Sequence, residues 1–138
     1  MKITNVKMIE YLSFFEEIKS FYLPQKIAYA ITKNAKMLAK EYEEMYLPRI
    51  NAMIENAKKN NWLVLDEDGV EKYDSNGSPI VKKDFAKDFN NEANELLLYE
   101  IDFDKWLTVE EEAFNYNDEK YTALTPQQLG LLMDILQQ

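Results

Sequence analysis

Carboxylates are the main side chains in this chain that could do acid–base chemistry. The 138 residues contain neither cysteine nor histidine, which excludes thiol nucleophiles, imidazole bases, disulfides and zinc sites of the usual ligand set. Asp102 and Asp104 alternate along one short run, and Glu110, Glu111 and Glu112 follow closely. Paired carboxylates can serve a hydrolase. Because no nucleophile motif or glycine-rich phosphate loop accompanies them, a carboxylate hydrolase is the weakest alternative, and we expect no enzyme and no cofactor.

Two acidic runs, DEDGVE (66–71) and DSNG (74–77), bring carboxylate and amide oxygens together as a calcium loop does. In the first run Gly69 arrives two positions too early for the calcium-loop pattern, and the second run is only a fragment of it. Asp, Asn and Gly are also the typical residues of tight turns. We therefore predict two turns here and no metal site.

Residues 99–122, the acidic segment, mix aromatic side chains with carboxylates. Aromatic residues are favoured in interface cores, and carboxylates steer a basic partner. Two other interpretations stay open: the aromatics close the protein's own core beneath solvent-facing acids, or the carboxylates mimic nucleic-acid phosphates. Tyr99, Glu100, Asp118, Glu119 and Tyr121 belong to the same pattern. The partner-binding candidates are Asp102, Phe103, Asp104, Trp106, Glu110, Glu111, Glu112, Phe114 and Tyr116.

Charge is divided unevenly along the chain. Residues 1–60 hold ten Lys/Arg and seven Asp/Glu, a net charge of +3, whereas residues 61–138 hold six and eighteen, a net charge of −12. Either the halves partly neutralise each other, or the acidic half presents an outward face to a basic partner. Lysines at positions 26, 33, 36 and 40 fall along one side of a predicted helix. At a net +3, we interpret them as the polar back of that helix rather than a nucleic-acid site.

Apolar spacing predicts helices through most of the first 60 residues. Asn5 is the expected N-cap of a helix over about 6–21. Pro24 suits the first position of a second helix, whose apolar stripe passes through Asn34 or Ala35, and the short connection favours an antiparallel hairpin. Pro48 predicts a kink or a break near Met45–Leu47, after which the helical pattern resumes.

The second half changes pattern. Runs at 62–65, 70–73 and 79–82 predict a small β-hairpin or meander. A middle helix is expected over about 84–98, followed by an extended acidic segment, and Thr125-Pro126 begins a short final helix. The fold class is mainly α with a minor β element (α+β), in one domain over 1–138.

No membrane or secretion signal is evident. The start MKITNVKMIEYLSFF carries charges every few residues and does not match a signal peptide. No run approaches the ~18 apolar residues of a membrane span. We predict a cytoplasmic protein with no membrane partner.

Several separated stretches resemble one protein family. They are MKITN before an amphipathic helix, LPQKIAYAITKNAKML, the DEDG and DSNG turns, KDFAKDFNNEANELLLYEIDFDKWL, and the short helix after LTP. Together they are similar to small uncharacterised phage and prophage proteins of Gram-positive bacteria. The resemblance implies a phage setting in a bacterial host, where small accessory proteins commonly bind virion or host components, and it implies no catalytic residues.

Our leading hypothesis is a non-enzymatic, phage-encoded interaction protein. It would bind a host or phage protein with a basic face through the acidic and aromatic residues of the acidic segment. In one version of this hypothesis, the binding inhibits or triggers a bacterial defence system. The alternative is a virion assembly or tail accessory protein that acts as a homo-oligomer.

Overall fold

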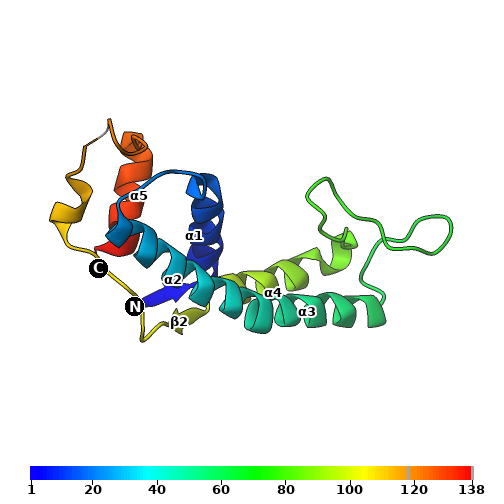
Figure 1. Ribbon diagram of the computed structural model, residues 1–138. Coiled ribbons are helices and arrows are strands. Elements are labelled where there is room, and N and C mark those ends of the chain that lie inside the picture. Colours follow the sequence, from blue (N-terminus) through cyan, green and yellow to red (C-terminus); the bar gives the residue numbers. More distant parts are fainter. Residues whose placement is uncertain (118, 138) are drawn as a thin grey trace. The chain divides into compact units, whose positions relative to one another are not determined.

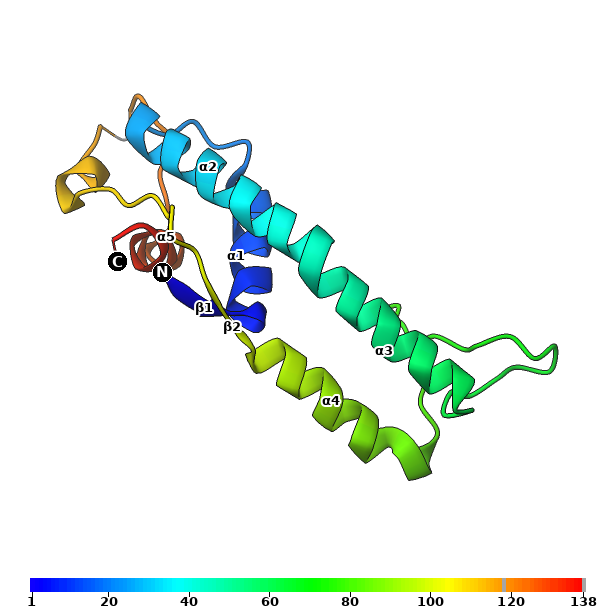
Figure 2. The ribbon, with the colours of Figure 1, turned by 90° about the horizontal axis from the view of Figure 1, so that it is seen from below.

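The computed structural model describes residues 1–117 and 119–137 and is mainly helical, with one small antiparallel sheet (Figures 1 and 2). The predicted fold class is confirmed. The elements are β1 (Lys2–Thr4), α1 (Asn5–Ile18), α2 (Gln25–Glu41), a π-helical turn (Tyr42–Tyr46), α3 (Leu47–Lys59), a 3₁₀ turn (Lys83–Phe85), α4 (Ala86–Leu98), β2 (Glu100–Asp102), a second 3₁₀ turn (Glu111–Phe114) and α5 (Pro126–Leu136).

The chain divides into two compact units. The first consists of Met1–Tyr42 and Glu100–Gln138, and the second of Glu43–Tyr99. The units do not coincide with the basic half (1–60) and the acidic half (61–138) of the sequence. The acidic C-terminal stretch belongs to the first unit, together with the N-terminal helices. A single folding domain over 1–138 stays a prediction, since two compact units can still unfold together.

The first unit begins with β1, which pairs with β2 in antiparallel register, Ile3 opposite Ile101. This pairing extends the backbone up to Thr4, whose φ of −79° and ψ of 162° suit an N-cap. The Thr4 hydroxyl accepts a hydrogen bond from the Lys7 N–H at 3.3 Å. Asn5, predicted as the cap, instead lies inside α1 and is buried. The cap therefore falls one residue earlier than the sequence pattern indicated.

The helices α1 and α2 are in contact as the predicted helical hairpin, and in Figures 1 and 2 α2 crosses α1 obliquely as the chain turns back. Pro24 occupies the N-cap of α2, one residue before the predicted position. Helix α5 is held at its start by a capping box in which Thr125 and Gln128 exchange hydrogen bonds of 3.0 and 3.1 Å. The largest fully buried side chains of this unit come from all three helices: Met8, Ile18, Ile27, Asn34, Leu38, Leu132, Ile135 and Leu136.

The predicted break before Pro48 takes the form of a π-helical turn between α2 and α3. Proline has no N–H to donate, and its ring clashes with the carbonyl of the residue one turn earlier. A wider turn over Tyr42–Tyr46 lets the helix pass this point without stopping. The helical hydrogen-bond pattern therefore changes locally at Tyr42–Tyr46, just before Pro48.

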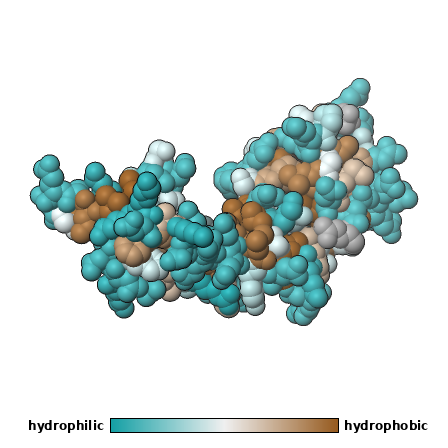
Figure 3. All heavy atoms as spheres, turned by 180° about the vertical axis from the view of Figure 1, so that it is seen from behind, coloured by the Kyte–Doolittle hydropathy of each residue, from teal (hydrophilic) through white to brown (hydrophobic). Residues whose placement is uncertain are grey.

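In the second unit, α3 ends at Lys59. Asn61 adopts a φ of +60°, and the Trp62 N–H donates to the Ala57 carbonyl at 2.9 Å. This is the hydrogen-bond pattern of a Schellman motif. It turns the chain so that the Trp62 ring stacks on Phe85, with centroids 5.4 Å apart. Figure 3 shows apolar side chains at the surface of both units among polar ones.

The three predicted strands of this unit form only isolated bridges. Leu63 pairs with Val81, Leu65 with Glu71, and Tyr73 with Pro79. Each segment therefore changes partner halfway along its length. The backbone N–H of Val64 donates to Ile80, that of Ile80 to Lys72 and that of Lys72 to Val64, at 2.8–3.0 Å. This closed triangle explains why no continuous strand develops, since no two segments stay paired for more than one bridge.

The acidic runs between these segments are turns. One carboxylate oxygen of Asp66 accepts the N–H groups of Asp68 and Val70, both at 2.9 Å. Asp74 does the same in the second turn, with Asn76 and Ser78. Gly69 and Gly77 close the two turns with φ of +78° and +79°, a region that glycine adopts without a steric penalty. In the described ranges no group of three or more Asp, Glu, His or Cys is arranged to hold a metal ion.

One ion pair links α3 to this triangle. The Lys58 ammonium lies 2.8 Å from the Glu71 carboxylate, whose side chain is 17% exposed. The hydrogen bond and the charge of Glu71 raise the pKa of Lys58 above its usual value. The hydrogen bond from Lys58, with a backbone hydrogen bond, lowers the pKa of Glu71.

Candidate functional site

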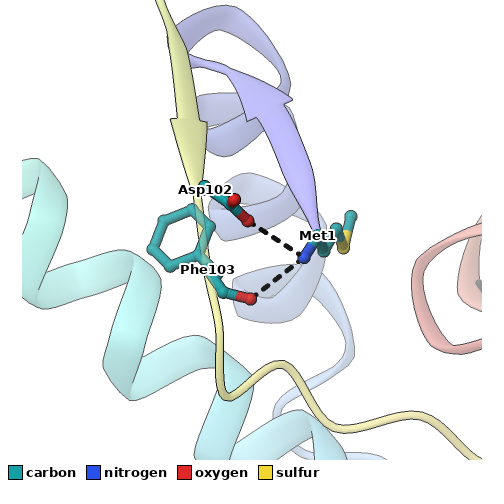
Figure 4. Close-up of polar contacts among 3 residues, drawn as sticks. All are labelled: Met1, Asp102 and Phe103. Atoms are coloured by element: carbon teal, nitrogen blue, oxygen red, sulfur yellow. Dashed lines mark hydrogen bonds and ion pairs between the residues drawn. The ribbon is translucent and has the colours of Figure 1, made fainter.

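The acidic segment contributes residues 100–122 to the first unit, whereas Tyr99 lies in the second unit beneath the Arg49 guanidinium, 5.2 Å from its ring centroid. Strand β2 begins the segment. The N-terminal ammonium lies 3.4 Å from the Asp102 carboxylate and donates to the Phe103 carbonyl at 3.0 Å (Figure 4). Asp102 is therefore tied to the fold, although its side chain is 53% exposed.

Two aromatic candidates anchor the segment rather than standing free. Phe103 is only 8% exposed and packs against Trp106, with ring centroids 5.8 Å apart. The Trp106 indole N–H donates to the Ile135 carbonyl in α5 at 2.9 Å. Of the open interpretations, these two residues fit the one in which aromatic side chains close the protein's own core.

Asn34 in α2 holds the same stretch from the other side, and it is the residue that sequence analysis left without a role. It is fully buried. Its side-chain N–H donates to the Leu107 carbonyl at 2.8 Å, and its side-chain oxygen accepts the Leu107 N–H at 2.9 Å. A signal was present, because an asparagine within an apolar helical stripe must find a hydrogen-bond partner when buried. The sequence did not indicate that the partner would be a backbone 73 residues away.

The four remaining carboxylate candidates face solvent. Asp104, Glu110, Glu111 and Glu112 are all exposed. Within residues 1–117 and 119–137, none of the four takes part in an ion pair. Glu111 and Glu112 begin a 3₁₀ turn, which brings them close together on the surface. Asp118 lies outside the described residues. In the described ranges the segment thus presents four exposed carboxylates that form no ion pair with the protein's own lysines.

A tyrosine cluster closes the far end of the segment. Tyr121 stacks on Tyr22 at 5.3 Å between centroids, and Tyr116 meets Tyr121 edge-on at 5.4 Å. Thr122 donates its N–H to the Tyr22 carbonyl and accepts the Tyr22 N–H on its hydroxyl, both at 2.8 Å. Tyr22 remains 62% exposed, and Tyr116 is half-buried, as is the other predicted aromatic contact, Phe114.

A groove of about 480 Å³ runs between α2 and residues 107–113. Lys26, Tyr29 and Ala30 line it on the α2 side, and Glu110 and Glu112 are among its lining residues on the opposite side. Tyr29 is 55% exposed, with the Lys33 ammonium 5.7 Å from its ring centroid. At this groove two of the exposed acids, Glu110 and Glu112, border a concave surface.

The four lysines of α2, at positions 26, 33, 36 and 40, are exposed. The exposure of these lysines agrees with the solvent-facing polar side of an amphipathic helix, which is how the sequence was interpreted. It gives no separate support to the nucleic-acid alternative.

Comparison with known protein families, with curated proteins and with solved structures yields no match to this chain. No helix within the described residues is both long enough and apolar enough to span a membrane. Membership of a phage protein family stays a prediction.

Proposed function

We propose that this protein is a non-enzymatic binding protein that captures a partner with a basic face through the acidic segment. One observation carries the proposal: Asp104, Glu110, Glu111 and Glu112 are exposed and have no ion-pair partner in the described ranges. Unneutralised surface carboxylates attract cationic partners and speed their association.

The way the segment is held also supports binding. Asn34 and Trp106 fix its backbone and its aromatic face to α2 and α5. A fixed segment loses little conformational freedom when it binds, so more of the interaction energy is available as affinity. The half-buried Tyr116 and the exposed Tyr22 supply amphipathic aromatic rings in the same unit as the acids, and such rings suit an interface.

The resemblance to small phage and prophage proteins suggests where such a partner would be found. We propose a host or phage protein in the bacterial cytoplasm, with a component of a defence system as one version. Inhibition and triggering of that system are both compatible with a charge-steered binding surface.

Charge reversal tests the proposal with a matched control. Affinity capture from a bacterial host lysate would use the wild type, Glu111→Lys and Glu67→Lys. Glu67 is also exposed, but it lies in a turn of the second unit. We expect a basic protein to be recovered with the wild type and with Glu67→Lys, and lost with Glu111→Lys. Equal recovery with all three would overturn the proposal. Asp102→Lys is a poorer test, because it also breaks the contact with the N-terminal ammonium.

A homo-oligomeric assembly protein is the second candidate, and one observation favours it. Leu65, Val70 and Tyr73 in the second unit are each at least 50% exposed, and clustered exposed apolar residues are typical of association surfaces. Light scattering that shows a stable oligomer in the wild type and a monomer in Leu65→Ser would support this candidate. A monomeric wild type would refute it.

A further inference from the structure

The two acidic turns of the second unit share one hydrogen-bond pattern and differ in one chemical group. Each turn begins with an aspartate whose carboxylate accepts the N–H groups two and four residues ahead, at 2.9–3.0 Å. Gly69 and Gly77 each donate their N–H to the carbonyl of that aspartate at 3.1 Å. The residue before the glycine is Asp68 in the first turn and Asn76 in the second. The second turn therefore carries a side-chain amide where the first carries a carboxylate.

An asparagine that precedes a glycine can react with its own backbone. The glycine nitrogen gives its proton to solvent and attacks Cγ of the asparagine, so that an N–Cγ bond forms. The Cγ–Nδ2 bond then breaks, and the departing nitrogen takes a proton from solvent and leaves as ammonia. Water opens the resulting five-membered succinimide ring at either carbonyl. The products are aspartate and isoaspartate, and in isoaspartate the main chain runs through Cγ. Water is the only co-reactant, which is one reason why asparagine is a thermolabile residue.

Asn76 meets the structural requirements of this reaction. It is exposed, and it is the only asparagine of the chain that precedes a glycine. Its side-chain amide forms no hydrogen bond within the described ranges, whereas the buried amide of Asn34 is held by Leu107. No atom lies within 4 Å of the place where a side chain on Gly77 would stand. The glycine is therefore uncrowded, and its backbone has the freedom to bring the nitrogen to Cγ.

One hydrogen bond opposes the reaction. The Gly77 N–H donates to the Asp74 carbonyl, and this bond must open before the nitrogen can lose its proton. Residues 74–78 are all exposed, and the hydrogen bonds of exposed loops open at little cost in free energy. The bond therefore slows the reaction without preventing it.

We propose that Asn76 is a site of spontaneous deamidation, and that its two products affect the turn differently. The aspartate product keeps the turn, because Asp68 has the same place and the same hydrogen bonds in the first turn. The isoaspartate product adds a main-chain carbon between Asp74 and Ser78, so the Asp74 carboxylate loses its fit to both N–H groups. The site lies in the second unit, and the inference does not depend on the proposed function.

The test incubates the full-length wild type in mildly alkaline and in mildly acidic buffer and maps its peptides by mass spectrometry. Deamidation changes the peptide mass, and chromatography separates the aspartate and isoaspartate forms. Asn115 is the internal control, because it is also exposed but precedes Tyr116. Asn76→Gln is the matched variant, since its longer side chain cannot close a five-membered ring.

We expect Asn76 to react at least about fivefold faster than Asn115, because glycine reaches the ring-closing conformation more easily than a residue with a side chain. Both products should form, at a rate that rises with pH, and position 76 of Asn76→Gln should stay unchanged over the same time. Equal rates at Asn76 and Asn115, or aspartate as the sole product, would overturn the deamidation site.

Thermal unfolding tests the effect on the turn. Asn76→Asp should unfold at the temperature of the wild type, since the first turn already contains an aspartate at this place. The isoaspartate form, separated by chromatography from the incubated wild type, should unfold at a lower temperature. Equal melting temperatures of the isoaspartate form and Asn76→Asp would overturn the proposed opening of the turn.

Discussion

Replacing Asn34 gives the sharpest test of how the acidic segment is held. The side chain is fully buried and makes two hydrogen bonds to the Leu107 peptide, of 2.8 and 2.9 Å. Asn34→Leu keeps the volume similar but leaves the Leu107 N–H and carbonyl unpaired. Each lost bond costs about 1 kcal/mol, and more where the remaining group stays buried. The free energy of unfolding should therefore fall by about 2–4 kcal/mol.

Asn34→Asp adds a pH dependence to the same contact. The carboxylate can still accept the Leu107 N–H, but its second oxygen faces the Leu107 carbonyl, so a buried charge is left uncompensated. Such a charge costs about 3–5 kcal/mol at neutral pH. The folded-state pKa of the new carboxyl should be raised above its unfolded value near ~3.9. Protonation of the new carboxyl restores a donor toward the Leu107 carbonyl. The stability that Asn34→Asp loses at neutral pH should therefore shrink as the pH falls through the raised folded-state pKa toward the unfolded-state pKa.

Urea unfolding followed by Trp106 fluorescence measures both effects, in a Trp62→Phe background that leaves one tryptophan. Asn51→Asp on the exposed surface of α3 is the matched control, and it should change the unfolding free energy by less than about 0.5 kcal/mol. The reasoning is refuted if Asn34→Leu behaves like this control. It is also refuted if the stability lost in Asn34→Asp is the same at pH 7 and at about pH 4.

Three further outcomes follow from single contacts. Trp106→Phe keeps an aromatic ring but loses the hydrogen bond to the Ile135 carbonyl. The free energy of unfolding in urea should therefore fall by about 1 kcal/mol, and an unchanged value would contradict a stabilising role for this hydrogen bond. Lys58→Met should raise the pKa of Glu71 toward its usual value of 4.5, measured by carboxyl NMR titration, and an unchanged titration would disprove the ion pair. The stabilisation from this pair should be present between the usual pKa values of 4.5 and 10.5, and it should fade as the pH falls below the first or rises above the second. Gly77→Ala forces a side chain into a φ of +79°, so it should destabilise the second unit by about 1 kcal/mol in thermal unfolding, whereas an unchanged melting temperature would contradict the turn geometry.

Local signals in the sequence predicted the parts of the fold that depend on neighbouring residues. Apolar spacing gave the helices, and Pro48 marked the change of winding before α3. The DEDG and DSNG runs became turns because Asp66 and Asp74 bond to amides two and four residues ahead. Each of these features is decided within a few residues of chain.

Pairings between distant residues could not be predicted in this way. Strand β1 is three residues long and pairs with a strand about 100 residues later, so it carries no alternating pattern long enough to detect. The same limit applies to the triangle of bridges at Leu63, Leu65 and Tyr73, whose segments each meet two partners. The position of the N-cap followed from the β1 pairing, and this is why it fell at Thr4 rather than Asn5.

For the candidate site, the sequence indicated which residues take part but not which of them face solvent and which belong to the core. The carboxylates Asp104, Glu110, Glu111 and Glu112 lie on the surface, as a binding face requires. Phe103 was proposed as a partner contact on its residue type alone, and it is buried against Trp106. An aromatic residue has the same sequence signature whether it serves an interface or the protein's own core, because both environments favour its large apolar surface.

The salt dependence of partner binding tests the central claim most directly. It compares the dissociation constants of the wild type, Glu111→Lys and Glu67→Lys for the captured partner over a range of ionic strength. If exposed carboxylates of the acidic segment carry recognition, binding by the wild type and Glu67→Lys should weaken as salt rises. Glu111→Lys should bind about tenfold more weakly at low salt and show a shallower dependence. Equal affinities of all three proteins at every salt concentration would contradict the account.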